Sequence, residues 1–218
     1  MRVVLLDVEG TVGRISFVKG VLYPYARARL RGFLAGREAE WRGRVVAEMG
    51  EEDGGGDGWV RALERWAEED RKIGVLKEIQ GKIWAEGFVS GELRAHLYPE
   101  VEGWMRAQVE AGARLAIYSS GSVEAQQLYF GYTIVGDLRP LISGWFDTKM
   151  GAKQEPAAYQ RIAERLGVEP GAITFYSDQP AELEAARQAG CAVVQVRRPD
   201  EPGAAAGSGW PVVEQLGE

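Results

Sequence analysis

The chain is poor in cysteine, in basic side chains relative to acidic ones, and in long apolar runs. Its single cysteine, Cys191, excludes a disulfide within the chain, and a reducing cytoplasm is the expected location. The formal net charge of −6 does not suggest a nucleic-acid partner. No apolar run approaches the roughly 18 residues of a membrane span, and no signal-peptide pattern opens the sequence. We therefore expect a cytoplasmic protein that binds neither nucleic acid nor membrane.

Long low-complexity segments and internal repeats are also missing, which argues against a disordered chain and a repeat architecture. The 218 residues are 45% hydrophobic and 27% charged, a composition typical of globular proteins. This length is enough to bury a core in one large domain or in two small ones.

The stretch from Val3 to Thr11 organises the rest of the chain. Its apolar residues Val3–Leu6 are too few for a helix and predict a strand buried on both faces of a parallel sheet. Asp7 follows at the expected carboxyl end of that strand, where open α/β sheets bind their ligands. Glu9 would share a side with Asp7 in an extended chain, and Gly10 allows a tight turn. The alternative is a strand end whose acids merely face solvent.

The next segment is helical throughout. Apolar residues recur near helical spacing in 26–49, and two further helices are expected at 59–70 and 75–86. An acidic, glycine-rich loop is expected at 51–58. Consecutive helices without a strand among them predict a small inserted domain, which we place at residues 18–96 as a helical cap.

From Pro99 onwards, strand and helix patterns alternate. Strands are expected at 114–118, near 145–146, at 173–176 and at 192–196, with helices between them. Such alternation predicts βαβ units and a mainly parallel sheet with helices on both faces. The expected fold is therefore α/β, with a doubly wound core formed by residues 1–17 and 97–218 and interrupted once by the helical cap.

Four polar motifs lie at the ends of predicted elements: Asp7 with Glu9, then Ser119-Ser120-Gly121, Lys153 and Asp178. The carboxyl ends of parallel strands meet at one edge of a sheet, so the strand-end motifs should converge. Each motif also has an ordinary explanation. Serines and Ser-Asp pairs before a helix cap its free amides, and a lone lysine is usually a solvated surface group. All four together, in this order on one sheet, favour a catalytic site.

In these residues the sequence resembles the haloacid dehalogenase superfamily of aspartate-nucleophile phosphatases, and within it the enolase-phosphatases of methionine salvage. The usual first motif of the superfamily is Asp-x-Asp-x-Thr, whereas this chain has Asp7-x-Glu9-Gly10-Thr11, with a glutamate characteristic of enolase-phosphatases. Further similar segments are Ile15-Ser16-Phe17-Val18, Ser90-Gly91-Glu92-Leu93, Tyr118 to Gln126, and Phe146-Asp147-Thr148-Lys149 ahead of Lys153. The resemblance covers nearly the whole chain. Val12-Gly13-Arg14 departs from the threonine-rich turn usual after the first motif.

The resemblance implies a role for each of the four motifs. Asp7 would be the nucleophile that forms an aspartyl-phosphate, and Glu9 would protonate the leaving oxygen and later activate water. One Mg²⁺ per chain would be bound by the carboxylates of Asp7 and Asp178 and by the main-chain carbonyl of Glu9. The phosphoryl oxygens would be held by the remaining motif residues, Ser119, Ser120, Gly121 and Lys153.

The resemblance also implies the reaction. A phosphorylated small molecule, 2,3-diketo-5-methylthiopentyl-1-phosphate, would be enolised and then dephosphorylated to an acireductone. The sequence does not identify the base for enolisation. One substrate enclosed by the chain's own cap requires no partner subunit, so we expect a monomer.

Three other protein classes are alternatives to this interpretation. A general Mg²⁺-dependent phosphatase of small metabolites would share the four motifs, but Glu9 and the segment from Ser119 argue against it. A non-catalytic binding protein would be expected to have lost one motif, and none is lost. A response-regulator receiver has no helical insertion after its first strand.

Three further residues with reactive side chains lie outside the four motifs. Glu182, four residues after Asp178, is either a partner of the site or a surface helix residue, with nothing in the sequence to choose between them. His96 is expected to be structural, and Cys191 to be a small buried hydrophobe.

Overall fold

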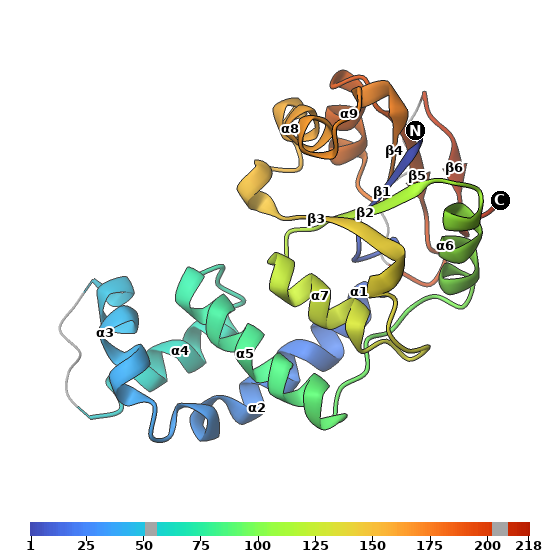
Figure 1. Cartoon of the computed structure of the whole chain (residues 1–218). Coiled ribbons are helices and arrows are strands. Elements are labelled where there is room, and N and C mark those ends of the chain that lie inside the picture. The colour runs from blue at the N-terminus through green and yellow to red at the C-terminus, as the bar shows by residue number, and fades with distance from the viewer. Residues whose placement is uncertain (51–55, 202–208) are drawn as a thin grey trace. The chain divides into compact units, whose positions relative to one another are not determined.

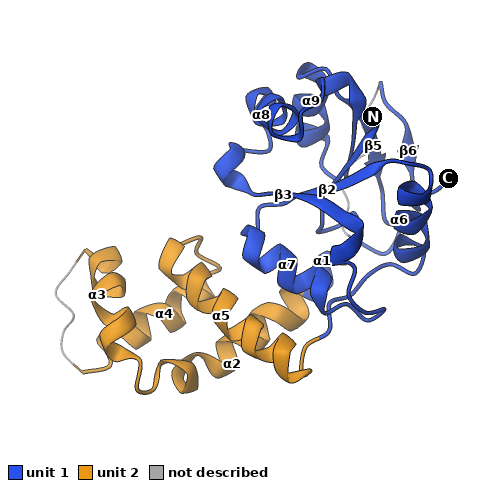
Figure 2. Ribbon diagram, viewed as in Figure 1, with its two compact units in different colours: residues 1–17, 94–218 blue, residues 18–93 orange. Residues whose placement is uncertain are grey.

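The structure, a computed structural model, describes residues 1–50, 56–201 and 209–218. Its chain divides into two compact units (Figure 2): residues 1–17 with 94–218, and residues 18–93. The boundary expected at residues 96 and 97 therefore falls at 93 and 94. No helix among the described residues is long and apolar enough to cross a membrane.

Unit 1 (residues 1–17 and 94–218) contains a six-stranded sheet in the order β3-β2-β1-β4-β5-β6. All strand pairs are parallel. The strands are β1 (Val3–Leu6), β2 (Arg114–Tyr118), β3 (Ile142–Phe146), β4 (Ile173–Ser177), β5 (Ala192–Val196) and β6 (Val212–Val213). The chain winds from β1 towards β3 on one side and from β4 towards β6 on the other, so the doubly wound α/β fold is confirmed.

Helices cover both faces of this sheet (Figure 1). One face packs against α8 (Pro156–Leu166) and α9 (Pro180–Gln188), and its core includes Leu5, Tyr159 and Phe175. Helices α6 (Val101–Glu110) and α7 (Val123–Gly131) pack on the other face, against β2 and β3. Short helical turns complete the unit: α1 (Ile15–Phe17), η2 (Arg139–Leu141), η3 (Thr148–Met150) and η4 (Pro170–Ala172).

The four residues of β1 are almost fully buried, as a central strand covered on both faces requires. Leu6 at its end is in register with Ile117 of β2 and Tyr176 of β4. The amide of Asp7 still donates to the carbonyl of Tyr176, at 3.0 Å. The sheet's hydrogen bonds therefore fix the backbone of Asp7 at the carboxyl edge.

The described residues of unit 2 (residues 18–93) form helices joined by short connections, and none of them lies in a strand. The helices are η1 (Val18–Leu22), α2 (Tyr23–Leu34), α3 (Glu38–Met49), α4 (Gly58–Glu68) and α5 (Gly74–Ser90). These helices enclose their own core around Trp41, Leu63 and Trp66.

The helical pattern expected over 26–49 forms two helices, because the chain breaks between α2 and α3. Gly36 there has a φ of 76°, a left-handed conformation that ends α2 and that glycine adopts without strain. Both helices turn an apolar face to the same core, so the apolar spacing continues across the break. The sequence pattern therefore does not indicate where the first helix ends. Of the loop expected at 51–58, residues 51–55 lie outside the described residues.

The packing of α2 against α5 can be tested with two glycines of α5. A Cβ on Gly87 would lie 2.5 Å from the hydroxyl oxygen of Tyr25 and 2.6 Å from its Cζ, whereas a Cβ on Gly81 would meet nothing within 4 Å. Gly81→Ala should raise the free energy of unfolding by about 0.5–1 kcal/mol, through helix propensity alone. Gly87→Ala should lower it by about 1–2 kcal/mol, because overpacking outweighs propensity. Urea denaturation measures both, and a stabilising Gly87→Ala would contradict this packing.

Candidate active site

A buried lysine connects the ends of several elements at the carboxyl edge of the sheet. Lys153 lies between η3 and α8, and its Nζ is 2.5 Å from Oδ1 of Asp7 and 2.6 Å from Oε2 of Glu182. All three side chains are at least nine-tenths buried. Burial would lower the pKa of Lys153, but the charges of Asp7 and Glu182 raise it above its ordinary value. Lys153 is therefore a fixed, permanently charged ammonium.

The backbone and aromatic rings around Lys153 hold it in place. The hydroxyl of Tyr159 donates to the carbonyl of Lys153 at 2.8 Å, and that of Tyr118 donates to the carbonyl of Gly151 at 3.0 Å. The ammonium lies 5.7 Å from the ring centroid of Tyr118 and 5.8 Å from that of Phe175. Aromatic faces at this distance attract a cation and exclude water from it.

The turn after β1 brings Asp178 beside the first motif. Gly10 has a φ of 77°, and a Cβ there would lie 2.8 Å from Oδ2 of Asp178. Only glycine lets the turn approach this carboxylate so closely. Burial, followed by the charge of Asp7, raises the pKa of Asp178 to about 7. The two aspartates therefore share one electrostatic environment.

Glu182 resolves the choice that the sequence left open. It lies in the first turn of α9, is 6% exposed, and accepts hydrogen bonds from both Lys153 and the hydroxyl of Ser177, the latter at 3.0 Å. Burial and the charge of Asp7 raise its pKa. Glu182 is thus a partner of the site and not a surface residue. Its position four residues after Asp178 was the only signal in the sequence.

The serine motif forms a loop between β2 and α7. Ser119 is buried, and its Oγ accepts a hydrogen bond from the amide of Gly121 at 3.2 Å. Ser120 is exposed. Ser122 caps α7 by accepting from the amide of Ala125 at 3.2 Å. Because β2 lies next to β1 and parallel to it, this loop lies at the same edge of the sheet as Asp7.

Two side chains to which the sequence assigned no role, Gln126 and Asp147, support the serine loop. Gln126 Nε2 donates to the carbonyls of Gly121 and Phe146, both at 2.8 Å. Asp147 accepts from the amide of Val123, the first residue of α7, at 3.4 Å. These bonds tie the loop and the start of α7 to the end of β3.

His96 and Cys191 lie in unit 1 and are not among the residues that surround Lys153 in the described structure. The carbonyl of His96 accepts a hydrogen bond from Tyr129, and burial, with the charge of Arg14, lowers the pKa of the His96 imidazole. Cys191 is buried in the apolar core, and this burial raises the pKa of its thiol to about 11. A thiol in such surroundings is inert.

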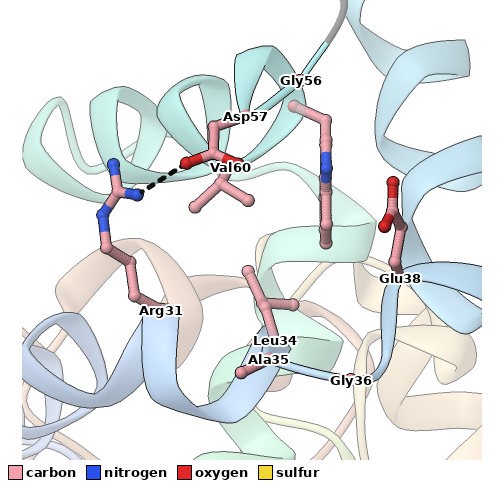
Figure 3. A pocket seen from close by; sticks show the side chains of 9 residues that line it. Arg31, Leu34, Ala35, Gly36, Glu38, Gly56, Asp57 and Val60 are labelled. Atoms are coloured by element: carbon pink, nitrogen blue, oxygen red, sulfur yellow. Dashed lines mark hydrogen bonds and ion pairs between the residues drawn. The ribbon is translucent and has the colours of Figure 1, made fainter.

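A separate surface hollow of about 340 Å³ lies in unit 2 (Figure 3). The Arg31 guanidinium at its rim is bound to Asp57 at 3.3 Å and to Glu64 at 2.6 Å. The remaining lining is mostly small or apolar: Leu34, Ala35, Gly36, Glu38, Gly56, Trp59 and Val60. The four motifs contribute no residue to this lining.

Known proteins share this fold and much of this sequence. Residues 1–190 match the haloacid dehalogenase-like hydrolase family. The chain is 46% identical over 210 residues to the Enolase-phosphatase E1 of Aquifex aeolicus, covering 93% of each chain. It is 47% identical to that of Stenotrophomonas maltophilia, covering 92% of this chain and 88% of the relative. The chain belongs to the enolase-phosphatases of the haloacid dehalogenase-like hydrolases.

Solved structures agree with this membership. The UTR4 protein of Saccharomyces cerevisiae superposes with a TM-score of 0.83 at 30% identity, covering 99% of this chain and 98% of that one. CbbY of Rhodobacter sphaeroides superposes with a TM-score of 0.66 at 16% identity, covering 100% and 96%. The latter likeness shows the fold alone. The resemblance inferred from the motifs is thus confirmed: the protein is an enzyme of the enolase-phosphatase type.

The contact between Glu182 and Lys153 can be tested against a matched substitution on the same helix. Glu182→Gln keeps the size of the side chain but removes one of the two charges that hold the ammonium. We expect phosphate release to fall by about 10- to 100-fold, as is typical when a partner behind an active-site group is lost. Glu184→Gln, which changes only surface contacts with Arg187 and Gln188, should leave the rate unchanged. Equal rates for the two variants would contradict the role of Glu182.

Proposed function

We propose that this enolase-phosphatase converts 2,3-diketo-5-methylthiopentyl-1-phosphate to the acireductone 1,2-dihydroxy-3-keto-5-methylthiopentene, a step of methionine salvage, through an aspartyl-phosphate at Asp7. The observation that carries the proposal is the buried ion pair between Asp7 and Lys153, with Asp178 beside the same turn. The names of the relatives support the two half-reactions, enolisation and dephosphorylation.

Asp7 is the proposed nucleophile because the sheet holds its backbone and Lys153 holds its carboxylate. Phosphate monoesters are among the slowest compounds to hydrolyse without a catalyst. Attack by a carboxylate oxygen of Asp7 on phosphorus divides the reaction into two displacements. In the first, the phosphorus–oxygen bond to the substrate breaks and Glu9 protonates the leaving oxygen. In the second, Glu9 takes a proton from a water that attacks phosphorus, which frees phosphate and restores Asp7.

Lys153 and the serine loop are proposed to hold the phosphoryl oxygens. Lys153 offers a buried positive charge that needs no rearrangement when negative charge develops. Ser119, Ser120 and the amides near Gly121 lie ahead of the start of α7, and a helix N-terminus binds anions through its free amides. These groups orient the phosphoryl group for in-line attack by Asp7.

The residues at this edge of the sheet fit a bound Mg²⁺. The carboxylates of Asp7, Asp178 and Glu182 are buried near the single ammonium of Lys153. These three acids and one lysine together favour the binding of a cation. Among the described residues, no three His, Cys, Asp or Glu side chains converge on a metal position. Mg²⁺ does not require three, because it keeps several waters and binds one or two carboxylates. Asp7, Asp178 and the carbonyl of Glu9 would hold it.

When bound, Mg²⁺ would offset the repulsion between carboxylate and phosphate and polarise the substrate's oxygens.

We further propose that unit 2 serves as a cap whose closure excludes water, since it is one insertion in the chain of unit 1. We also propose a monomer as the working enzyme, because a substrate enclosed by the chain's own cap requires no partner subunit.

The assignment of Asp7 is tested with Asp7→Asn and the diketo substrate. The amide is not a nucleophile, so phosphate release should vanish while the fold persists. Enolisation needs a base and a polarised carbonyl but no attack on phosphorus, so the enolised phosphate should accumulate as a new ultraviolet band. Asp137→Asn, on the surface of unit 1, is the control. If Asp7→Asn retained a tenth of the wild-type rate of phosphate release, Asp7 could not be the nucleophile.

Metal removal gives an independent test. Excess EDTA should abolish phosphate release, and added Mg²⁺ should restore it. Ca²⁺ should restore it poorly, because that ion prefers looser coordination with more ligands. Phosphate release is measured by a colorimetric assay at each metal concentration. Full activity in excess chelator would contradict the metal site.

A further inference from the structure

The turn that carries Glu9 is closed by its own backbone. The carbonyl of Val8 accepts from the amides of Thr11, Val12 and Gly13, at 3.3, 3.0 and 3.0 Å. The amide of Gly10 donates to the carbonyl of Gly13 at 2.8 Å, and Glu9 forms a bridge with Gly13. Residues 8–13 therefore behave as one rigid piece, and any group that holds this piece also sets the position of Glu9.

Two consecutive carbonyls of this turn are held from outside it. The amide of Tyr98 donates to the carbonyl of Val12 at 3.1 Å. Arg198 donates to the carbonyl of Thr11 through both Nε, at 3.1 Å, and Nη2, at 2.5 Å. Thr11 in turn donates through Oγ1 to Oδ2 of Asp7, at 3.4 Å. Arg198, two residues after the end of β5, thus holds the turn by the backbone carbonyl of Thr11.

Arg198 is itself fixed on its other sides. Its side chain is 3% exposed, and Nη1 lies 2.5 Å from Oε1 of Glu100 and 3.2 Å from the carbonyl of Glu214. The guanidinium carbon lies 3.8 Å from the ring centroid of Tyr98, whose amide binds the same turn. The guanidinium reaches these acceptors from three nitrogen atoms in one plane, Nε, Nη1 and Nη2, whereas a lysine has all three of its donors on a single nitrogen.

We propose that Arg198 is a positioning residue for the acid–base group Glu9. A buried charge is rarely the most stable choice for a protein core. The hydrogen bonds described for the Arg198 guanidinium go either to the turn or to Glu100 and Glu214, which hold the guanidinium in place. Arg198 holds the turn so that the Glu9 carboxyl stays within reach of the leaving oxygen. This inference rests on the acid–base role of Glu9 in the proposed function.

The dependence of rate on the leaving group separates positioning of Glu9 from a general structural role. Para-nitrophenyl phosphate releases a stable phenolate that needs no proton, whereas a simple alkyl phosphate must receive one. Phosphate release is measured as kcat/KM on both compounds for Arg198→Lys, with Arg197→Lys, an exposed neighbour, as the matched control. Glu9→Gln is measured as the reference for complete loss of the acid.

We expect Arg198→Lys to slow the alkyl phosphate by about tenfold or more and the aryl phosphate by less than about threefold. The reference Glu9→Gln should show the same bias at about 100-fold or more, the range of general acid catalysis. Arg197→Lys should match the wild type on both compounds. Glu100→Gln, which weakens the hold on Arg198 without removing it, should show the same bias at about two- to fivefold, and it remains informative if Arg198→Lys does not fold.

Equal losses on both compounds in Arg198→Lys, or no bias in Glu100→Gln when Arg198→Lys does not fold, would overturn the positioning role. In that case a biased Glu9→Gln would leave the proposed function intact. An unbiased Glu9→Gln would instead remove the acid–base role of Glu9, and the role of Arg198 with it.

Discussion

The site depends on one buried ammonium placed among three carboxylates. Lys153 contacts Asp7 and Glu182 directly, and Asp178 lies against the same turn as Asp7. Such a cluster costs free energy to bury, and an apolar core of equal volume would be at least as stable. The proposed function gives this arrangement a chemical reason: the lysine would orient Asp7 as the nucleophile, and the carboxylates would bind a divalent cation.

Rigid elements hold each member of this cluster. Asp7 and Asp178 follow two neighbouring strands whose register is fixed by the sheet, and Glu182 lies in the first turn of the next helix. Lys153 arrives from a loop, but Tyr159 and Tyr118 bind the backbone of that loop from the core. Catalytic groups held in this way lose little further entropy when the substrate binds, which is the condition for electrostatic stabilisation of a transition state.

Much of this arrangement follows from the sequence, because strand ends carry the chemistry. The apolar run before Asp7 and the alternation after Pro99 predict the parallel sheet, and a parallel sheet brings its carboxyl ends to one edge. The role of Glu182 was not predictable, since an acid in the first turn of a helix reads equally well as a surface residue. Arg198 was missed for a similar reason. Its partners are mostly backbone carbonyls, which every residue type has, so the amino-acid sequence does not indicate them.

The break at Gly36 shows a different limit of the sequence. Apolar spacing records which face of a chain is buried, and α2 and α3 bury theirs in the same core. A periodic pattern therefore continues through a point where the backbone turns. The backbone conformations of residues 35–37, which the spacing of apolar residues does not encode, separate the two helices.

In the proposed reaction, an oxygen of Asp7 becomes bonded to phosphorus during turnover. Rapid acid quenching during steady-state hydrolysis, followed by borohydride reduction and peptide mass spectrometry, tests it directly, because reduction converts an aspartyl-phosphate to homoserine at the same position. We expect homoserine at position 7 in the quenched enzyme and none in enzyme quenched without substrate. An unmodified Asp7 during full turnover, or a phosphoryl group recovered on Ser119, would contradict it.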